Sequence, residues 1–304
     1  MDKTDKIRQE IQSIPSETRL RESMDIDSMS TIDALKVIND QDKTVPYAIS
    51  NSLDDIAAAV DASAHALSQG GRLIYIGAGT SGRLGILDAV ECRPTFSVPD
   101  DLVVGIIAGG EKALIHAVEG AEDDALGGKR DLINISLSSK DIVIGLAASG
   151  RTPYVLGAIE YANSLSCATA CIVCNPNAPL LELANIGIVA NVGPEVLTGS
   201  TRMKSGTAQK LILNMVSTTT MIKLGKTYSN LMVDVNATNE KLLARAVHIV
   251  MQATTCSAEK AKATLAESNN NAKLAILMIL TNRDVTTSKA MLDKHSGYLN
   301  KALN

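Results

Sequence analysis

The sequence lacks the features that mark several classes of protein. It has no tryptophan, one phenylalanine and six tyrosines in 304 residues, so an aromatic platform for stacking nucleotide bases is not expected. The net charge of −4 argues against a broad electrostatic surface for nucleic acid. The longest apolar run, LAILMIL at 274–280, is far too short to cross a bilayer, and the polar start MDKTDKIRQE predicts no signal peptide. Any bound anion must therefore be held by a local group of residues.

Cysteines and histidines are also few. Five cysteines without the spacing of a disulfide framework suit a reducing cytoplasm. Cys171 and Cys174 form a C-x-x-C pattern, but they lie in an expected buried strand, where residues three apart point to opposite faces. We therefore expect core packing there. The four histidines (65, 116, 248 and 295) are scattered, so the sequence predicts no metal site.

The pattern of apolar runs predicts the fold class. Short runs rich in β-branched residues alternate with helical patterns, and each is nearly continuous in apolar residues, as in strands covered on both faces. The runs lie at 72–77, 102–108, 141–148, 168–174 and 186–192. They predict a parallel sheet between two layers of helices, a three-layer αβα sandwich. Ligands of such sheets bind beyond the carboxyl ends of the strands.

Three regions are expected along the chain. Residues 1–62 are an N-terminal helical segment, 63–226 form the sheet domain, and 241–304 form a small helical bundle. Ser257 is the expected N-cap of one helix in the bundle, with Glu259 in its first turn. Further helices are expected at about 30–39, 45–69, 153–165, 180–185 and 205–225.

Three loops combine glycine, hydroxyl and basic residues at the starts of helices. GAGTSGR (77–83) reads G-x-G-x-x-G but contains Thr80 and Ser81, and we expect Ser81 both to cap the following helix and to bind a phosphate oxygen. ASGRTP (148–153) offers Thr152 as N-cap and Pro153 at the first helical position, with Ser149, Gly150 and Arg151 at the mouth of the helix. TGSTRMKSGTAQK (198–210) places Ser200, Thr201, Arg202 and Lys204 at another helix start.

These loops suit one compact phosphate better than a pyrophosphate. A dinucleotide fold would place an acidic residue about 20 residues beyond the glycines, whereas Glu111 lies about 30 residues beyond them. The alternative is that the loops are only helix caps. We interpret the three together as a site for a sugar phosphate.

Two acidic segments lie close to these loops in the sequence. DAVECRPTF places Glu91 at the end of the first loop's helix, just before Pro94. HAVEGAEDD places Glu119 and Glu122 on one face if that segment is helical.

The same segments carry a family resemblance that runs nearly end to end. The matching motifs are INDQDKTVP (38–46), GRLIYIGAGTSGRLGILDA (71–89), AGGE (108–111), HAVEGAED (116–123), GLAASGRTPYV (145–155), GSTRMKSGTAQK (199–210) and NLMVDVNATNEKL (230–242). With them the chain resembles the N-acetylmuramic acid 6-phosphate etherases, which have the flavodoxin-like sugar isomerase (SIS) fold. A regulator of glucokinase shares part of the pattern.

The resemblance implies cleavage of the D-lactyl ether of N-acetylmuramic acid 6-phosphate by water, without a cofactor, in a homodimer. It implies Glu91 as the acid and Glu122 as its catalytic partner and candidate base; the residues alone do not assign the two roles. The phosphate-binding loops of the wider fold match this chain at Ser81, Ser149 and Thr152. The basic residues that are candidates for binding the phosphate and the lactyl carboxylate are Arg83, Arg151, Arg202 and Lys204. His116 is a candidate for ring opening, although a structural role is the favoured interpretation of this histidine. The chain departs from the usual family pattern at Val90 and Arg93, where serine and proline are usual, and in ETRL (17–20).

The spacing of these residues raises a geometric question. In an unbroken helix over 82–91, Glu91 would lie roughly 13 Å along the axis from the phosphate loop, beyond a sugar's reach from its phosphate to C2. Either the site is shared between two subunits, or the helix breaks early at Gly85. A sugar-phosphate isomerase and a non-catalytic phosphosugar sensor are the rival functions.

Overall fold

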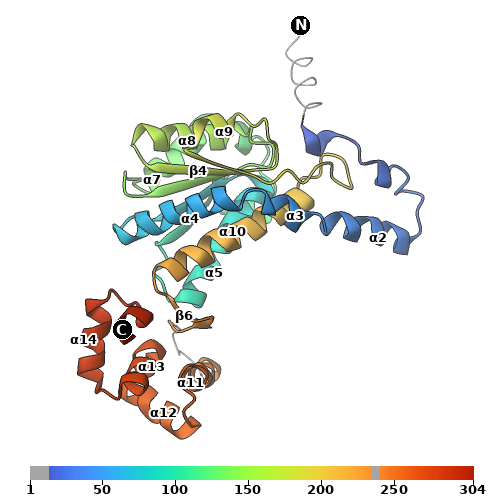
Figure 1. Cartoon of the computed structure of the whole chain (residues 1–304). Helices are drawn as coiled ribbons and strands as arrows, with labels where there is room; N and C mark the ends of the chain where they lie inside the picture. The colour runs from blue at the N-terminus through green and yellow to red at the C-terminus, as the bar shows by residue number, and fades with distance from the viewer. Residues whose placement is uncertain (1–13, 235–239) are drawn as a thin grey trace. The chain divides into compact units, whose positions relative to one another are not determined.

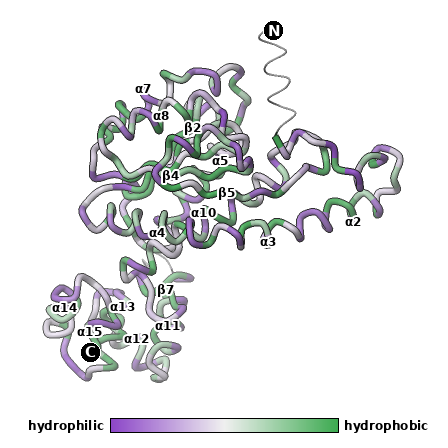
Figure 2. The backbone as a smooth tube through the Cα atoms, turned by 45° about the horizontal axis from the view of Figure 1, so that its top comes forward, coloured by the Kyte–Doolittle hydropathy of each residue, from purple (hydrophilic) through white to green (hydrophobic). Residues whose placement is uncertain are grey.

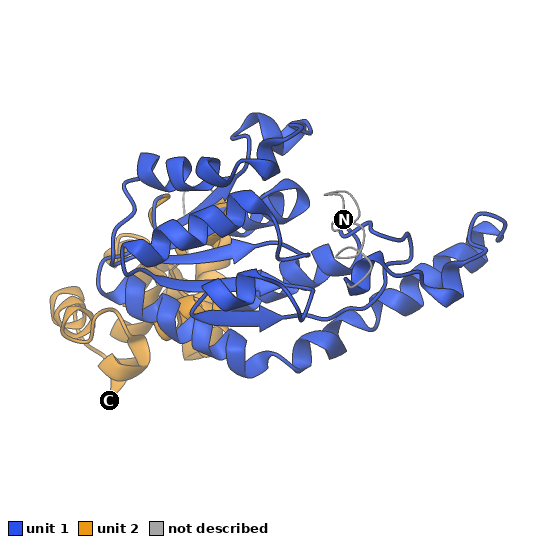
Figure 3. Cartoon of the chain, turned by 90° about the horizontal axis from the view of Figure 1, so that it is seen from above, with its two compact units in different colours: residues 1–89, 101–217 blue, residues 90–100, 218–304 orange. Residues whose placement is uncertain are grey.

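The computed structural model describes residues 14–234 and 240–304. The chain divides into two compact units (Figure 3). Unit 1 runs to Ala89 and continues from Asp101 to Ser217, and unit 2 holds Val90–Asp100 and the residues from Thr218 onward. The first 13 residues of the expected N-terminal segment, and residues 235–239 of one family motif, lie outside the described residues.

Unit 1 is built on a parallel sheet of five strands in the order β2-β1-β3-β4-β5. The strands are β1 (Leu73–Gly77), β2 (Val103–Ile107), β3 (Ile142–Leu146), β4 (Ala168–Val173) and β5 (Ile186–Val189). Each falls within one of the expected apolar runs, and the hydropathy of β4 and β5 is visible in Figure 2. The parallel sheet is thus confirmed.

Helices cover both faces of this sheet (Figure 1). One face carries α7 (Ala125–Asn134), α8 (Pro153–Ser164) and the short α9 (Leu180–Leu183). The other carries α4 (Leu53–Ser68), α5 (Gly79–Phe96) and α10 (Lys204–Lys223). The three-layer sandwich is therefore confirmed. The remaining helices of unit 1 are α2 (Thr31–Asp42), α3 (Val45–Ser50), α6 (Lys112–Ile115) and the 3-10 turns η1 (Pro15–Glu17), η2 (Arg21–Ser23) and η3 (Ala121–Asp123).

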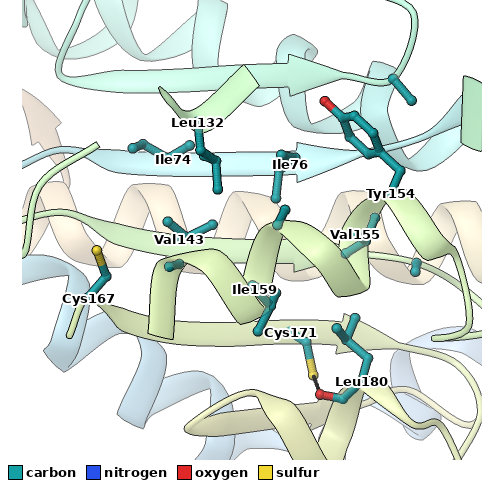
Figure 4. Close-up of a cluster of buried hydrophobic side chains, with 14 of the residues drawn as sticks. Ile74, Ile76, Leu132, Val143, Tyr154, Val155, Ile159, Cys167, Cys171 and Leu180 are labelled. Carbon is teal, nitrogen blue, oxygen red and sulfur yellow. Dashed lines mark hydrogen bonds between the residues drawn. The ribbon is translucent and has the colours of Figure 1, made fainter. Parts of the chain in front are cut away.

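The core between the sheet and α7 and α8 explains why these segments fold as they do. Tyr154, Val155, Ala158, Ile159 and Ala162 recur at helical spacing, and all five are buried in α8. They pack on the strands together with Leu132 of α7 in the cluster of Figure 4. This packed layer fixes the position of the loop that enters α8.

Unit 2 is mainly helical. Its helices are α11 (Glu240–Thr254), α12 (Ala258–Glu267), α13 (Ala272–Thr281), α14 (Val285–Lys294) and α15 (Leu299–Leu303), preceded by a hairpin of β6 (Thr227–Tyr228) and β7 (Leu231–Met232). Ser257 caps α12 by accepting a hydrogen bond from the Lys260 N–H, as expected. The hairpin and α15 were not expected from the sequence. No helix within 14–234 and 240–304 is long and apolar enough to cross a bilayer.

Candidate active site

The strand order identifies where unit 1 can bind a ligand. β1 and β3 are neighbours, with Gly77 beside Leu146 at their carboxyl ends. From β1 the chain continues to β2 on one side, and from β3 to β4 on the other. In open parallel sheets, ligands bind in the crevice where the strand order reverses in this way. The fold thus places the loops after β1 and β3, which the sequence singled out, at the same edge.

The glycines of the loop after β1 allow close packing of strand and helix. Gly79 has a φ of +53°, in the left-handed region, where α5 begins. A Cβ at Gly82 would lie 2.7 Å from Cγ1 of Ile107 and 2.8 Å from the carbonyl oxygen of Gly77. Ser81 lies inside the first turn and its hydroxyl donates to Oε1 of Gln209 at 2.8 Å. The prediction that Ser81 caps the helix is therefore wrong, because the helix begins two residues earlier.

The loop after β3 has the expected backbone. Thr152 is the N-cap residue of α8 in an extended conformation, and Pro153 occupies the first helical position. The Thr152 side chain makes no capping hydrogen bond within the described residues. The Ser149 hydroxyl accepts from the N–H of Arg151 at 3.3 Å, and Gly150 between them has a φ of +67°. Hydroxyls from two loops therefore lie at the start of two helices.

The third predicted helix start is already filled by the chain itself. Glu195 is fully buried, and its carboxylate accepts from the N–H groups of Lys204 and Ser205, each at 2.9 Å, and from the Ser205 hydroxyl at 2.8 Å. Lys204 is also buried and its Nζ donates to Oε1 of Gln41 at 2.8 Å. Burial lowers the pKa of Lys204, and the charge of Glu195 opposes that shift.

Glu195 therefore takes the position at α10 where an anion would bind. This role of Glu195 could not be predicted, because no local signal in the sequence marks a carboxylate nine residues before the helix. Ser200 and Arg202 lie in the turn ahead of α10, with Arg202 exposed. The roles of Ser200, Arg202 and Lys204 in substrate binding stay predictions.

A cavity of about 210 Å³ opens beside the loop after β1. Its charged lining residues are Arg83, Glu119 and Glu122, and the rest of the lining consists of small or apolar residues. Nε of Arg83 donates to the carbonyl oxygen of Leu114 at 3.0 Å, which ties α5 to α6, the helix that precedes both glutamates in the chain. Charges of both signs thus line one cavity next to the loop of Ser81.

The two glutamates reach this cavity although residues 116–123 do not form a continuous helix. His116 is extended at the end of α6, Gly120 has a φ of +73°, and only η3 is helical, as a single 3-10 turn that contains Glu122. The left-handed glycine interrupts any continuous helix over 116–123. His116 is exposed and is not among the residues lining the cavity.

Glu91 lies on the last turns of α5, in the part of the chain assigned to unit 2. It is exposed. α5 continues through Pro94 to Phe96, so the prediction that the helix ends just before Pro94 is wrong, and so is the alternative of a break at Gly85. Nη1 of Arg93 lies 2.5 Å from Oδ2 of Asp100 in an ion pair, and both side chains are largely exposed.

The cysteines of the C-x-x-C pattern contact different parts of unit 1. Sγ of Cys171 lies 3.7 Å from the carbonyl oxygen of Leu180, and Sγ of Cys174 lies 3.8 Å from that of Ser205 (Figure 4 shows the first). Burial raises the pKa of each thiol to about 12. Among residues 14–234 and 240–304, no cluster of three His, Cys, Asp or Glu side chains could hold a metal ion.

The fold and these loops define a class of protein. Residues 125–218 match the SIS domain, 55–163 the glucokinase regulatory protein N-terminal SIS domain, and 229–273 the C-terminal lid domain of glucokinase regulatory protein. A solved phosphoheptose isomerase from Francisella tularensis has the same fold, with a TM-score of 0.52 and 19% identity over 64% of this chain and 100% of that one. The chain is thus an SIS-domain protein.

Curated relatives define the family more narrowly. An N-acetylmuramic acid 6-phosphate etherase of Actinobacillus pleuropneumoniae is 58% identical over 95% of this chain and 95% of the relative. One from Vibrio cholerae is 58% identical over 95% and 94%, and one from Cronobacter sakazakii is 56% identical over 96% and 98%. The chain belongs to the N-acetylmuramic acid 6-phosphate etherase family.

Proposed function

We propose that the protein cleaves the D-lactyl ether of N-acetylmuramic acid 6-phosphate with water, giving N-acetylglucosamine 6-phosphate and D-lactate. The observation that carries the proposal is the etherase family at 58% identity over nearly the whole chain. The cavity that joins Arg83 to Glu122 beside the Ser81 loop supports it. The reaction serves recycling of the amino sugars of the cell wall, in the cytoplasm.

The chemistry follows from the substrate. An alkoxide is a poor leaving group, so water does not displace it directly at neutral pH. Opening the sugar ring exposes an aldehyde at C1, which acidifies the hydrogen on C2. A carboxylate removes that proton while a carboxylic acid protonates the departing C3 oxygen, and lactate leaves. Water then adds at C3, a proton returns to C2 and the ring closes. The protein is therefore a carbon–oxygen lyase.

We assign the parts of this reaction as follows. Glu122, in the cavity next to the phosphate loops, is the base at C2, and Glu91 is the acid that protonates lactate. Ser81, Ser149 and Thr152 bind the phosphate, helped by the N-terminal ends of α5 and α8. Arg83 lines the cavity of Glu122 and is the cation best placed for the lactyl carboxylate.

Lactate release from N-acetylmuramic acid 6-phosphate tests the proposal. The wild type should release lactate, and Glu91→Gln or Glu122→Gln should abolish release while the phosphosugar still binds. Asp123→Asn is the matched control, because Asp123 is an exposed carboxylate in the same turn η3 that does not line the cavity. Formation of a ketose with the ether intact would favour an isomerase, and binding without any reaction would favour a sensor.

We further propose that the active site is shared within a homodimer. The support is that α5 is unbroken and that α2 buries none of its residues, with Ile32 and Leu35 58% and 54% exposed. Mixing inactive Glu91→Gln and Ser149→Ala proteins should then restore activity, because one of the two sites in a mixed dimer keeps both residues. No recovery after subunit exchange would contradict the shared site.

A further inference from the structure

A buried glutamine lies behind the loop that follows β1. Gln209 on α10 is 1% exposed, its Oε1 accepts from the Ser81 hydroxyl at 2.8 Å, and its Nε2 donates to the carbonyl oxygen of Ile172 at 3.5 Å. We propose that Gln209 is a positioning residue that directs the Ser81 proton and thereby sets the affinity for the sugar phosphate. This inference rests on the phosphate site of the proposed function and is independent of ether cleavage.

The neighbours of Gln209 fix the orientation of its amide. A carbonyl oxygen can only accept, so the amide turns its NH₂ group toward Ile172 and its oxygen toward Ser81. A serine hydroxyl has a single proton, and in this structure Ser81 gives it to Gln209. A phosphate dianion needs that same proton, because its oxygens are acceptors. Phosphate and Gln209 therefore compete for it.

A reversal of the amide resolves the competition. The contact with Ile172 is at the long limit of a hydrogen bond, and that carbonyl also accepts from the N–H of Ala147 at 3.3 Å, so it keeps a partner when the amide turns. The turn brings Oε1 of Gln209 to face this carbonyl oxygen, an unfavourable contact that the charge-assisted hydrogen bond from Ser81 to phosphate must outweigh. After the turn, Nε2 donates to the oxygen of Ser81 while the Ser81 hydroxyl donates to phosphate. Hydrogen bonds in such a chain polarise and strengthen one another. Gln209 thus changes from acceptor to donor when phosphate binds.

Local packing holds Gln209 at this place. A Cβ at Gly206, one turn earlier in α10, would lie 3.5 Å from Cγ2 of Thr80, so the first turns of α10 run close against the loop after β1. Since Gln209 is buried and Ser81 is its contact in that loop, Gln209 acts through Ser81 and not by touching substrate.

Two substitutions of similar size separate the two hydrogen-bonding roles. Gln209→Met can neither accept nor donate, and Gln209→Glu, when ionised, can only accept. We expect N-acetylglucosamine 6-phosphate, titrated calorimetrically at about pH 8, to bind about tenfold more weakly to Gln209→Met and about a hundredfold more weakly to Gln209→Glu. As the pH falls, the introduced carboxylate takes up a proton and becomes a donor, so the deficit of Gln209→Glu relative to wild type should shrink, while the deficit of Gln209→Met stays constant.

A double substitution tests whether the effect passes through Ser81. In a Ser81→Ala background, Gln209→Met should cause no further loss of affinity, because the hydroxyl that Gln209 directs is gone.

Two controls accompany these variants. Thermal unfolding of each variant reports on the fold, and Gln252→Glu makes the same chemical change at a position of α11, outside this site. The neighbouring elements carry the ionisable groups Arg83, Asp88, Cys174, Glu195, Lys204 and Lys210, which all variants share, so their titration cancels in the ratio to wild type.

Several outcomes would overturn the inference. Both Gln209 variants could bind like the wild type, their deficits could be equal at every pH, or Gln209→Met could cause its full loss without the Ser81 hydroxyl. A wild-type protein that binds the phosphosugar but releases no lactate would instead contradict ether cleavage and leave the role of Gln209 intact.

Discussion

Gly150→Ala tests whether the loop after β3 needs its backbone conformation to bind phosphate. Gly150 follows Ser149 and has a φ of +67°, which L-residues adopt at a cost of about 1–2 kcal/mol. An added Cβ would lie 2.3 Å from Cβ of Ala178 and 3.0 Å from Cγ1 of Val173. Non-bonded carbons prefer about 3.5–4.0 Å, so the loop or Ala178 must move by about 1.2 Å or more.

This movement sets the size of the expected effect. Overpacking of this kind costs about 1–3 kcal/mol, which with the backbone strain gives about 2–5 kcal/mol of stability. A shift of about 1 Å in the residues that position a substrate can lower the rate about a hundredfold. We therefore expect kcat/KM for lactate release to fall about a hundredfold, with weaker binding of N-acetylglucosamine 6-phosphate.

Gly193→Ala is the matched control. Gly193 has the same φ of +67°, but apart from its neighbours in the chain no heavy atom of the residues that the structure describes lies within 4 Å of the added Cβ. It should therefore lose only the backbone term of about 1–2 kcal/mol and keep its activity. Urea unfolding and lactate release, measured on both variants, separate the two contributions. Equal stability and full activity of both variants would show that the loop after β3 tolerates a Cβ at Gly150 without moving.

Two further predictions concern stability and thiol chemistry. Burial alone would raise the pKa of Asp141, but hydrogen bonds from Arg72 and the Ser138 N–H outweigh it, and the pKa lies below its ordinary value of 3.8. The charged form of Asp141 therefore stabilises the fold above about pH 4, and this stabilisation is lost as the pH falls through the folded-state pKa. In urea unfolding, Asp141→Asn should lower the free energy of unfolding by about 1–3 kcal/mol at neutral pH and by less in acid. A difference from the wild type that stays constant across this pH range would contradict the assignment. Cys256 is partly exposed, whereas the other four cysteines are buried. A thiol reagent should therefore modify one cysteine rapidly in the folded protein, and Cys256→Ser should remove that reaction. Rapid modification that survives the substitution would contradict the prediction.

The strands and two of the loops could be predicted because their signals are local. Continuous apolar runs mark strands buried on both faces, and all five were found within the expected ranges. The first helical position of Pro153 and the N-cap position of Thr152 also follow from neighbouring residues. These features suffice to bring the loops after β1 and β3 to one edge of the sheet.

The rest of the site depends on contacts between distant segments. Glu195 fills the start of α10, and Gln209 takes the proton of Ser81 from 128 positions away in the sequence. Neither interaction has a local pattern. Likewise, α5 passes through Pro94 although proline disfavours a helix interior. Tertiary packing, and not the local sequence, determines these features.

In the proposed reaction the C3–O bond of the substrate breaks and the oxygen of water replaces that of lactate at C3. The direct measurement is mass spectrometry of the products formed from N-acetylmuramic acid 6-phosphate in oxygen-18 water. We expect one heavy oxygen at C3 of N-acetylglucosamine 6-phosphate and an unlabelled hydroxyl in lactate. Heavy oxygen in the lactate hydroxyl, or no release of lactate, would contradict it.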